Sequence, residues 1–296
     1  MSITEVPFRS SEAAPPGVEV LSFDALLERA RGHLINPSSP MRPSFHHLVA
    51  VRGGRLDCSV DFTEHQLVEG DLIWVRPGQI LQFGTDLATS RGIVVLFAPG
   101  LLDHATVSAA HADRPAESSV PVHSPALLPL TDVLADEYHN PSGLPAAVQI
   151  AIVRHLLSIL VLHIGNHGHL SSEYGDTVFA AFRQAVEHGF AQTHRVEDYA
   201  RQLGYSVRTL TRASHVATGF GAKRVIQERV LLEAKRLLVH TELTSTVIAG
   251  RLGMPDPAAF GKFFRHQTGE TPATFRDRAR RSQQRLAAWP QFTDER

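Results

Sequence analysis

Three side chains near residue 210 have the type and the spacing needed to read the edges of DNA bases. Arg208 and Arg212 are four residues apart, and Thr211 lies between them. On a helix, side chains three and four residues apart share one face. A guanidinium can donate two hydrogen bonds to guanine O6 and N7, which discriminates against other bases by about 1–3 kcal/mol. These three residues are therefore the first candidates for contacts with bases.

Two short helices joined by a glycine turn are expected to position these side chains. The apolar pattern of residues 196–203 predicts a helix that ends at Gly204, because glycine tolerates the left-handed conformation that closes a helix. Ser206 is then placed to cap the next helix. The pattern predicts a helix-turn-helix unit whose second helix enters the major groove of double-stranded DNA.

A second copy of this pattern follows about 50 residues later. Its first helix is predicted over residues 245–252, and Asp256 is placed to cap its second helix. Ala258 and Lys262 are the groove-facing candidates there, and Arg265 is a candidate for a phosphate contact. Because most side chains of this segment are small, the second unit is expected to contribute phosphate contacts and packing on thymine methyl groups, with weaker base readout.

One long helix is predicted between the two copies, over about residues 222–240. At 1.5 Å per residue it is roughly 28 Å long. A helix of that length could hold two recognition helices about one turn of DNA apart, which is roughly 34 Å.

The region from Thr177 to Arg278 resembles the AraC/XylS family of bacterial transcription regulators. The first unit has the motif Ala-x-x-Leu-Gly-x-Ser-x-Arg-x-Leu-x-Arg at residues 200–212. The second unit has the family signature in Ile248-Ala249, Leu252-Gly253, Phe260-Gly261-Lys262-Phe263-Phe264-Arg265, Gly269, Thr271-Pro272 and Phe275-Arg276. The resemblance implies base-reading side chains at Arg208, Thr211 and Arg212. A solvated surface is the alternative for the two arginines.

The apolar positions of both motifs are expected in the core rather than at DNA. They are Ala200, Leu203, Leu210, Ala249, Leu252, Phe260, Phe263 and Phe275.

The front half of the chain shows a different pattern, with short apolar runs separated by turn residues. Strands are predicted over residues 45–51, 56–62, 72–75 and 93–98, which is typical of a small barrel or sandwich. Helices are predicted over residues 23–33, from about residue 127, and over 146–164. Residues 1–17 are expected to form a loose arm, and residues 109–129 a surface connection.

Residues 70–79 resemble the strand-and-turn motif of cupin barrels, which many AraC-family members carry as a ligand-sensing domain. The expected fold class is α+β, with an N-terminal cupin-like β-barrel and packed helices, and a C-terminal all-α domain of two helix-turn-helix units joined by a long helix. We expect residues 1–169 to form the sensor and dimerisation domain and residues 170–296 to form the DNA-binding domain.

A sensing pocket would be lined by one face of the strand around residue 48, and the sequence leaves open which face that is. The alternatives are His47, Val49 and Val51 or His46, Leu48 and Ala50. We take His47, Trp74 and Arg76 as the candidate effector-binding residues. Dimerisation through the helix over residues 146–164 and packing of that helix within the chain are both open.

A metal site is not expected in the barrel. His46 and His47 are adjacent, so they point to opposite faces of a strand. The later histidine of metal-binding cupins would fall at Leu81 or Gln82. No metal, cofactor or catalytic residue is therefore assigned, and the chain is not expected to be an enzyme. A metal-dependent cupin enzyme fused to a DNA-binding domain is the alternative.

The charge of the chain is unevenly distributed. The net charge of -1 combines about -7 over residues 1–172 with about +6 over residues 173–296, which indicates a polyanion partner for the second half. The single cysteine, Cys58, fits a reducing cytoplasm. The apolar stretch of residues 150–164 is interrupted by Arg154 and is expected to be too short to span a membrane.

These observations predict a cytoplasmic, sequence-specific transcription regulator. The resemblance implies an activator that is controlled by a small-molecule effector, by dimerisation, or by both. Its expected partners are double-stranded DNA, an unidentified effector, RNA polymerase and a second copy of the chain. No feature of the sequence distinguishes an activator from a repressor.

Overall fold

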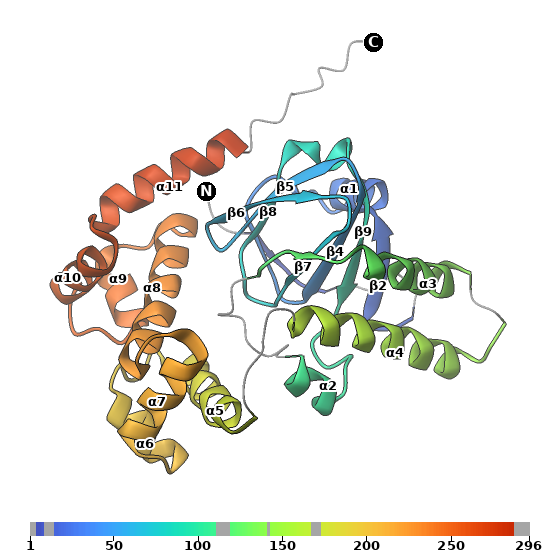
Figure 1. Cartoon of the computed structure of the whole chain (residues 1–296). Helices are drawn as coiled ribbons and strands as arrows, with labels where there is room; N and C mark the ends of the chain where they lie inside the picture. Colours follow the sequence, from blue (N-terminus) through green and yellow to red (C-terminus); the bar gives the residue numbers. More distant parts are fainter. Residues whose placement is uncertain (1–3, 9–14, 111–118, 141–142, 167–172, 287–296) are drawn as a thin grey trace, which may run out of the picture. The chain divides into compact units, whose positions relative to one another are not determined.

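The computed structural model describes residues 4–8, 15–110, 119–140, 143–166 and 173–286, and these form two units (Figure 1). The N-terminal unit contains the described residues up to 166, and the C-terminal unit contains residues 173–281. The expected domain boundary between residues 169 and 170 lies outside the described residues. Each unit has a fold of its own, and together they give the α+β class that the sequence predicts.

Two five-stranded sheets form the frame of the N-terminal unit. Their strand orders are β1-β3-β8-β5-β6 and β10-β7-β4-β9-β2. The elements are β1 (Thr4–Val6), β2 (Val18–Ser22), α1 (Phe23–Gly32), β3 (Met41–Pro43), β4 (His46–Gly53), β5 (Arg55–Val60), β6 (Thr63–Val68), β7 (Asp71–Val75), β8 (Leu81–Phe83), η1 (Thr85–Ala88), β9 (Arg91–Phe97), α2 (His104–Ala109), β10 (Val122–His123), η2 (Pro125–Leu127), α3 (Leu128–His139) and α4 (Ala146–Gly165).

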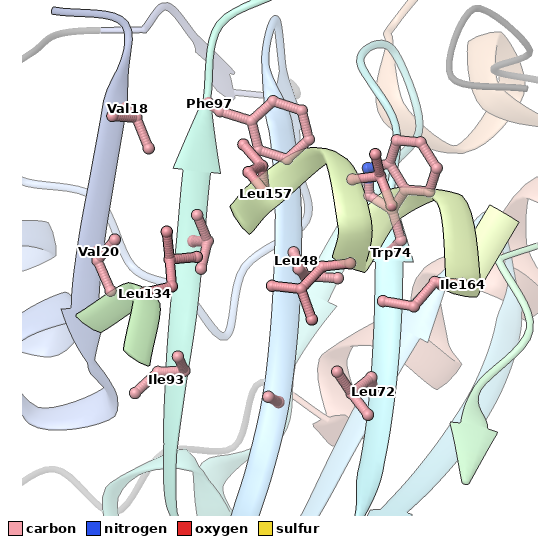
Figure 2. Close-up of a cluster of buried hydrophobic side chains, with 14 of the residues drawn as sticks. Val18, Val20, Leu48, Leu72, Trp74, Ile93, Phe97, Leu134, Leu157 and Ile164 are labelled. Carbon is pink, nitrogen blue, oxygen red and sulfur yellow. The ribbon is translucent and has the colours of Figure 1, made fainter. Parts of the chain in front are cut away.

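The central strand β4 contributes side chains to two separate cores. Val49 and Val51 belong to the core between the two sheets. Leu48 and Ala50 point the other way and pack in a second core, which helices α3 and α4 complete (Figure 2). Because neighbouring residues of a strand face opposite sides, a strand that is buried on both faces has to be apolar almost throughout. The run Leu48-Val49-Ala50-Val51 meets this requirement.

The strands expected from apolar runs are confirmed as β4, β5, β7 and β9, with small shifts at their ends. Several others were not expected. Strand β1 lies in the segment predicted to be a loose arm and pairs with β3. Strand β10 lies in the expected surface connection, pairs with β7 and has a buried Val122. The prediction of a surface connection is therefore wrong at the buried Val122, whereas His123 is exposed, and residues 111–118 lie outside the described part.

Helix α4 is longer and more apolar than its interrupted sequence indicated. Its 20 residues include an 18-residue window with a mean hydropathy of 1.9, so the expectation that it is too short to span a membrane is wrong as regards length. In the unit, Val153, Leu157 and Leu160 are fully buried against the sheet. A core helix can pass the same test of length and composition, but only 28% of this window is buried in the unit, so α4 covers the sheet with one side and exposes the other.

The C-terminal unit consists of helices in its described part. They are α5 (Glu173–Gly189), α6 (Val196–Leu203), α7 (Val207–Thr218), α8 (Ala222–His240), α9 (Ser245–Arg251), α10 (Pro257–Thr268) and α11 (Pro272–Leu286). The long helix expected over about residues 222–240 is confirmed as α8. Helices α5, α6 and α7 pack on α8, as do α9 and α10, so that α8 is shared by both helix-turn-helix units.

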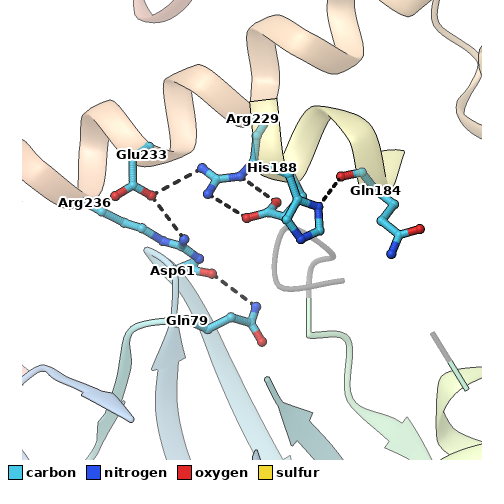
Figure 3. A network of polar contacts seen from close by, with 8 residues as sticks. Asp61, Gln79, Gln184, His188, Arg229, Glu233 and Arg236 are labelled. Carbon is cyan, nitrogen blue, oxygen red and sulfur yellow. Dashed lines mark hydrogen bonds and ion pairs between the residues drawn. The ribbon is translucent and has the colours of Figure 1, made fainter. Parts of the chain in front are cut away.

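A buried ion pair joins α5 to α8 (Figure 3). The Arg229 guanidinium donates two hydrogen bonds to Glu187, of 2.7 and 2.8 Å, and lies 3.3 Å from Glu233. It also stacks 3.9 Å above the ring of Phe190. Arg229 is 7% exposed, so removal of its carboxylate partner would leave a buried charge with one weaker contact.

We expect Glu187→Gln to lower the free energy of unfolding of the C-terminal unit by about 3 kcal/mol, because the buried guanidinium loses its bidentate partner and keeps only the weaker contact with Glu233. Urea denaturation followed by circular dichroism measures this loss. The matched control is Glu228→Gln, which removes an exposed partner of Arg224 on the same helix and should cost less than about 0.5 kcal/mol. Equal losses from the two variants would contradict the role given to Arg229.

Candidate DNA interface and effector cavity

The first helix-turn-helix unit is built by the local signals that its sequence contains. Helix α6 ends at Gly204, which has a φ of 70° and hence the left-handed conformation expected for it. The Ser206 hydroxyl accepts a hydrogen bond of 3.0 Å from the backbone N–H of Thr209 and so caps α7. The turn between the helices therefore fixes the direction in which α7 leaves the unit.

Helix α7 has a buried face and an exposed one. Leu210, Ala213 and Ser214 are buried, and the Ser214 hydroxyl donates to the Leu210 carbonyl. Arg208 and Arg212 are exposed, and Thr211 is half-buried beside them. Neither of these arginines has an ion-pair partner among the described residues, whereas the exposed Arg201 and Arg224 are paired with Asp198 and Glu228. The two side chains of α7 are thus available to an external anion.

The second unit has the same construction with smaller side chains. The Asp256 carboxylate accepts a hydrogen bond of 2.7 Å from the N–H of Ala259 and caps α10. Ala258, Lys262 and Arg265 are exposed on this helix. Neither Lys262 nor Arg265 has an ion-pair partner in the described part of the chain. Both recognition helices therefore present cationic side chains, with two arginines on α7 and one lysine and one arginine on α10.

Two residues expected in the core are only partly buried. Leu203 and Phe263 are half-exposed, whereas Phe264 is fully buried. The Phe264 ring lies 5.9 Å from that of Phe260 and 5.3 Å from that of Phe275, in edge-to-face contacts. The prediction for Phe263 is wrong because two adjacent aromatic residues on a helix cannot both face the core, and the periodicity did not determine which one does.

Two arginines of α11 hold the second unit on the end of α8, a role that the sequence did not reveal. Arg276 donates to the carbonyls of Leu238 and Leu243, at 2.7 and 2.6 Å. Arg280 donates to the carbonyls of Val239 and Thr241, at 3.0 and 2.7 Å. The last carbonyls of a helix lack partners within it, so these arginines satisfy the C-terminus of α8. Arg276 belongs to the signature motif and is structural here.

In the N-terminal unit, the two adjacent histidines of β4 face opposite sides of the sheet, as their spacing predicts. His46 stacks on Phe97 at 4.4 Å in the helix-covered core, near Trp74. Burial lowers its pKa to about 3, with smaller contributions from Arg76 and His47. His47 faces the space between the sheets and stacks on Phe45 at 4.7 Å. Burial lowers the pKa of His47 to about 4, and a backbone contact with Phe45 offsets only part of this effect.

A cavity of about 260 Å³ lies beside His47. Helix α1, the strands β3, β4, β8 and β9, and residues 6–8 near the N-terminus supply its lining. His47 is the one predicted effector residue that lines it. Trp74 faces the helix-covered core, and the Arg76 guanidinium stacks 4.4 Å above the Trp74 ring. The face of β4 that carries His47 therefore points toward the space between the sheets. Neither Trp74 nor Arg76 lines the cavity.

Comparison with known proteins matches both units to family models. An AraC-like ligand binding domain matches residues 23–150, and a helix-turn-helix domain matches residues 199–278. The chain belongs to the AraC family of transcription regulators. The two matched models describe a ligand-binding domain followed by a helix-turn-helix domain, and the AraC family is non-enzymatic.

Individual relatives of this AraC-family chain are distant. The HTH-type transcriptional activator RhaS of Klebsiella pneumoniae (strain 342) is 34% identical over 91 residues, which are 31% of this chain and 33% of the relative. The chain therefore matches about a third of the length of its curated relatives. The DNA-binding domain of AdpA, solved in complex with a target DNA, is 32% identical, with 38% of this chain and 96% of that chain covered and a TM-score of 0.32. ToxT from Vibrio cholerae is 9% identical, with 88% and 98% covered and a TM-score of 0.41.

A metal site is not formed by the described residues of the N-terminal unit. Within the ranges that the structure describes, no three histidine, cysteine, aspartate or glutamate side chains come together in a way that could hold a metal ion. His46 and His47 lie on opposite faces of β4, so they cannot ligate one ion together.

The lowered pKa of His46 predicts a dependence of stability on pH. Well above pH 6.5 the residue is neutral in both the folded and the unfolded chain. As the pH falls from 7.5 to 5.5, the unfolded chain binds a proton at an ordinary histidine pKa of about 6.5, whereas the folded chain does not, so folding loses about 1 kcal/mol. His46→Phe keeps the stacking on Phe97 and should reduce the loss of unfolding free energy between pH 7.5 and 5.5 by this amount.

Chemical denaturation of the full chain at the two pH values measures the effect. His104→Gln, which alters an exposed histidine on α2, is the control and should keep the pH dependence of the unaltered chain. If His46→Phe also keeps it, the buried imidazole is not the source.

Proposed function

We propose that this AraC-family protein is a sequence-specific transcription activator of the cytoplasm, which works as a homodimer and responds to a small-molecule effector. Residues 1–169 form its sensor and dimerisation domain in this proposal, and residues 170–296 its DNA-binding domain. The observation that carries it is the pair of exposed arginines on α7 that lack ion-pair partners among the described residues. The name of the RhaS relatives, transcriptional activators, supports activation and hence a contact with RNA polymerase.

Base reading is assigned chiefly to the first unit. Arg208, Thr211 and Arg212 lie on the exposed side of a helix whose start is fixed by the Ser206 cap. Arginines in that position can bond guanine bidentately, and threonine can bond either base edge or pack on a thymine methyl. A rigid helix start makes such geometry reproducible, which supports direct readout of sequence over general attraction to phosphates.

The second unit is assigned a weaker share of base reading. Its exposed positions are Ala258, which can pack on a thymine methyl, and Lys262 and Arg265, which can bind phosphates. Phosphate contacts set the position of a protein on the duplex and carry little sequence information. The base sequence of the operator is therefore expected to be well defined in the half that the first unit contacts and variable in the half that the second unit contacts.

The experiment that tests the proposal is a selection from a random duplex pool at two salt concentrations. The unaltered chain should enrich one motif of about two helical turns, and Arg208→Ala/Arg212→Ala should lose the part of the motif that the first unit reads. The control is Arg224→Ala/Arg281→Ala, which removes the same charge from α8 and α11. It should keep the motif even if affinity falls.

Two results would contradict this assignment. If both double variants lose the motif alike, total charge rather than base reading by α7 is decisive. If the unaltered chain enriches no motif and its binding simply weakens steeply with salt, the protein contacts the phosphate backbone without specificity.

The outer face of α4 is proposed as the dimer interface. Val148, Ile152, His155 and Ile159 follow one another at steps of four, three and four residues, which is the spacing of a coiled-coil seam. Val148 and Ile159 are each 44% exposed, while the opposite side of the helix is buried on the sheet. Apolar side chains at this spacing on a free helix face would be covered by the same face of a second copy.

Ile159→Glu should place two like charges near each other in the dimer and weaken association by at least tenfold, which corresponds to about 1.4 kcal/mol. Sedimentation of the full chain over a range of concentrations measures the dissociation constant. Ser108→Glu introduces the same charge on the exposed side of α2 and should leave the constant unchanged. A chain that stays dimeric with Ile159→Glu uses a different interface.

A further inference from the structure

The cavity beside His47 has a lining that limits which molecules it can hold. Its volume is about 260 Å³. An apolar cavity of about 150 Å³ takes up one benzene molecule, so this one has room for about ten non-hydrogen atoms. Phe8, Phe45 and Phe83 stand around it, and most of the remaining lining side chains are aliphatic. Phe8 and Phe45 are in edge-to-face contact at 5.3 Å.

Three of the described side chains that line the cavity are polar, and they differ in whether they can bind a ligand. His33 is exposed. The Arg29 guanidinium lies 3.3 Å from Glu19, a carboxylate that is 2% exposed and also accepts a hydrogen bond from Tyr138. The charge of Arg29 is therefore already balanced by a carboxylate of the protein, and a second anion would compete with it.

His47 is the polar lining residue that is buried. It is 3% exposed, and its Nδ1 atom is fully buried and has no hydrogen-bond partner among the described residues. A buried polar atom without a partner costs free energy, which a ligand atom in hydrogen-bond contact would recover. Because the low pKa keeps this imidazole neutral near pH 7, it can accept or donate a hydrogen bond but does not attract an anion.

The same lining disfavours two other classes of effector. A sugar would bury several hydroxyl groups against phenylalanine and aliphatic side chains, and each hydroxyl left without a partner weakens binding. A cation would meet Arg29, and none of the described residues that line the cavity is acidic. What remains is a molecule with a hydrocarbon or aromatic body and one uncharged polar group.

We propose that the effector is a small, mainly apolar and uncharged molecule that carries one hydroxyl or similar group, and that His47 forms the hydrogen bond to that group. This inference rests on the proposed function of the N-terminal unit as a sensor, and it names the class of molecule sensed. The aromatic side chains pack on the body of the ligand, and the single hydrogen bond sets its orientation.

Calorimetric titration of the full chain with four probes tests this assignment. They are 4-ethylphenol, ethylbenzene as its analogue without the hydroxyl, 4-ethylbenzoate as an anion, and D-xylose as a polyol. 4-Ethylphenol should bind most tightly, about fivefold to tenfold better than ethylbenzene, which is the contribution of one hydrogen bond. His47→Phe keeps an aromatic ring in the wall and should abolish this difference while ethylbenzene still binds.

A second variant keeps the test decisive if His47→Phe does not fold. Ala30→Leu fills the cavity from α1 and leaves His47 in place, so it should weaken both 4-ethylphenol and ethylbenzene. The inference is overturned if D-xylose or 4-ethylbenzoate binds more tightly than 4-ethylphenol, if Ala30→Leu has no effect, or if none of the four probes binds. A chain that selects its DNA motif but fails these titrations retains the proposed regulatory function and loses only this assignment of the effector.

Discussion

The carbonyl groups at the C-terminus of α8 have no partners within that helix, and the position of the second recognition helix depends on how they are satisfied. Four hydrogen bonds from Arg276 and Arg280 on α11 meet the carbonyls of this helix end and of the segment that follows it. At the other helix-turn-helix unit, the buried pair of Arg229 and Glu187 joins α5 to α8. These charged groups attach α8 to both helix-turn-helix units, so the proposed reading of two adjacent turns of DNA depends on this helix.

In the N-terminal unit the corresponding constraint is the burial of β4 on both faces. One face needs a partner sheet and the other needs helices, so the fold must supply two cores to a single strand. Neutral histidines are tolerated there because each stacks on an aromatic ring, His46 on Phe97 and His47 on Phe45. The sheet thus separates a helix-covered core from the cavity, and α4 can offer its outer face to a partner without disturbing the cavity lining.

The features that could be predicted from the sequence are those whose cause is local. Caps at Ser206 and Asp256 and the left-handed turn at Gly204 follow from one residue and its neighbours, and the length of α8 follows from its apolar period. Strand β6 was not predicted because it is largely exposed and polar, so that its pairing with β5 is the main reason for its conformation. The inward face of β4, the exclusion of Trp74 from the cavity and the contacts of Arg276 all depend on partners that are distant in sequence, which periodicity does not specify.

The two recognition helices also differ in a way that the packing of the unit does not explain. Gly261 lies within α10, where glycine costs about 1 kcal/mol relative to alanine. A Cβ at this position would meet no atom of the described chain within 4 Å, so the interior of the unit does not require glycine there. Gly261 has no side chain and the exposed Ala258 has a short one. Neither residue therefore keeps the backbone of α10 away from a phosphate chain. Close approach with few long side chains favours phosphate contacts, which position the protein on the duplex, over base readout. This agrees with the proposal that α7 reads bases and that α10 chiefly contacts the backbone.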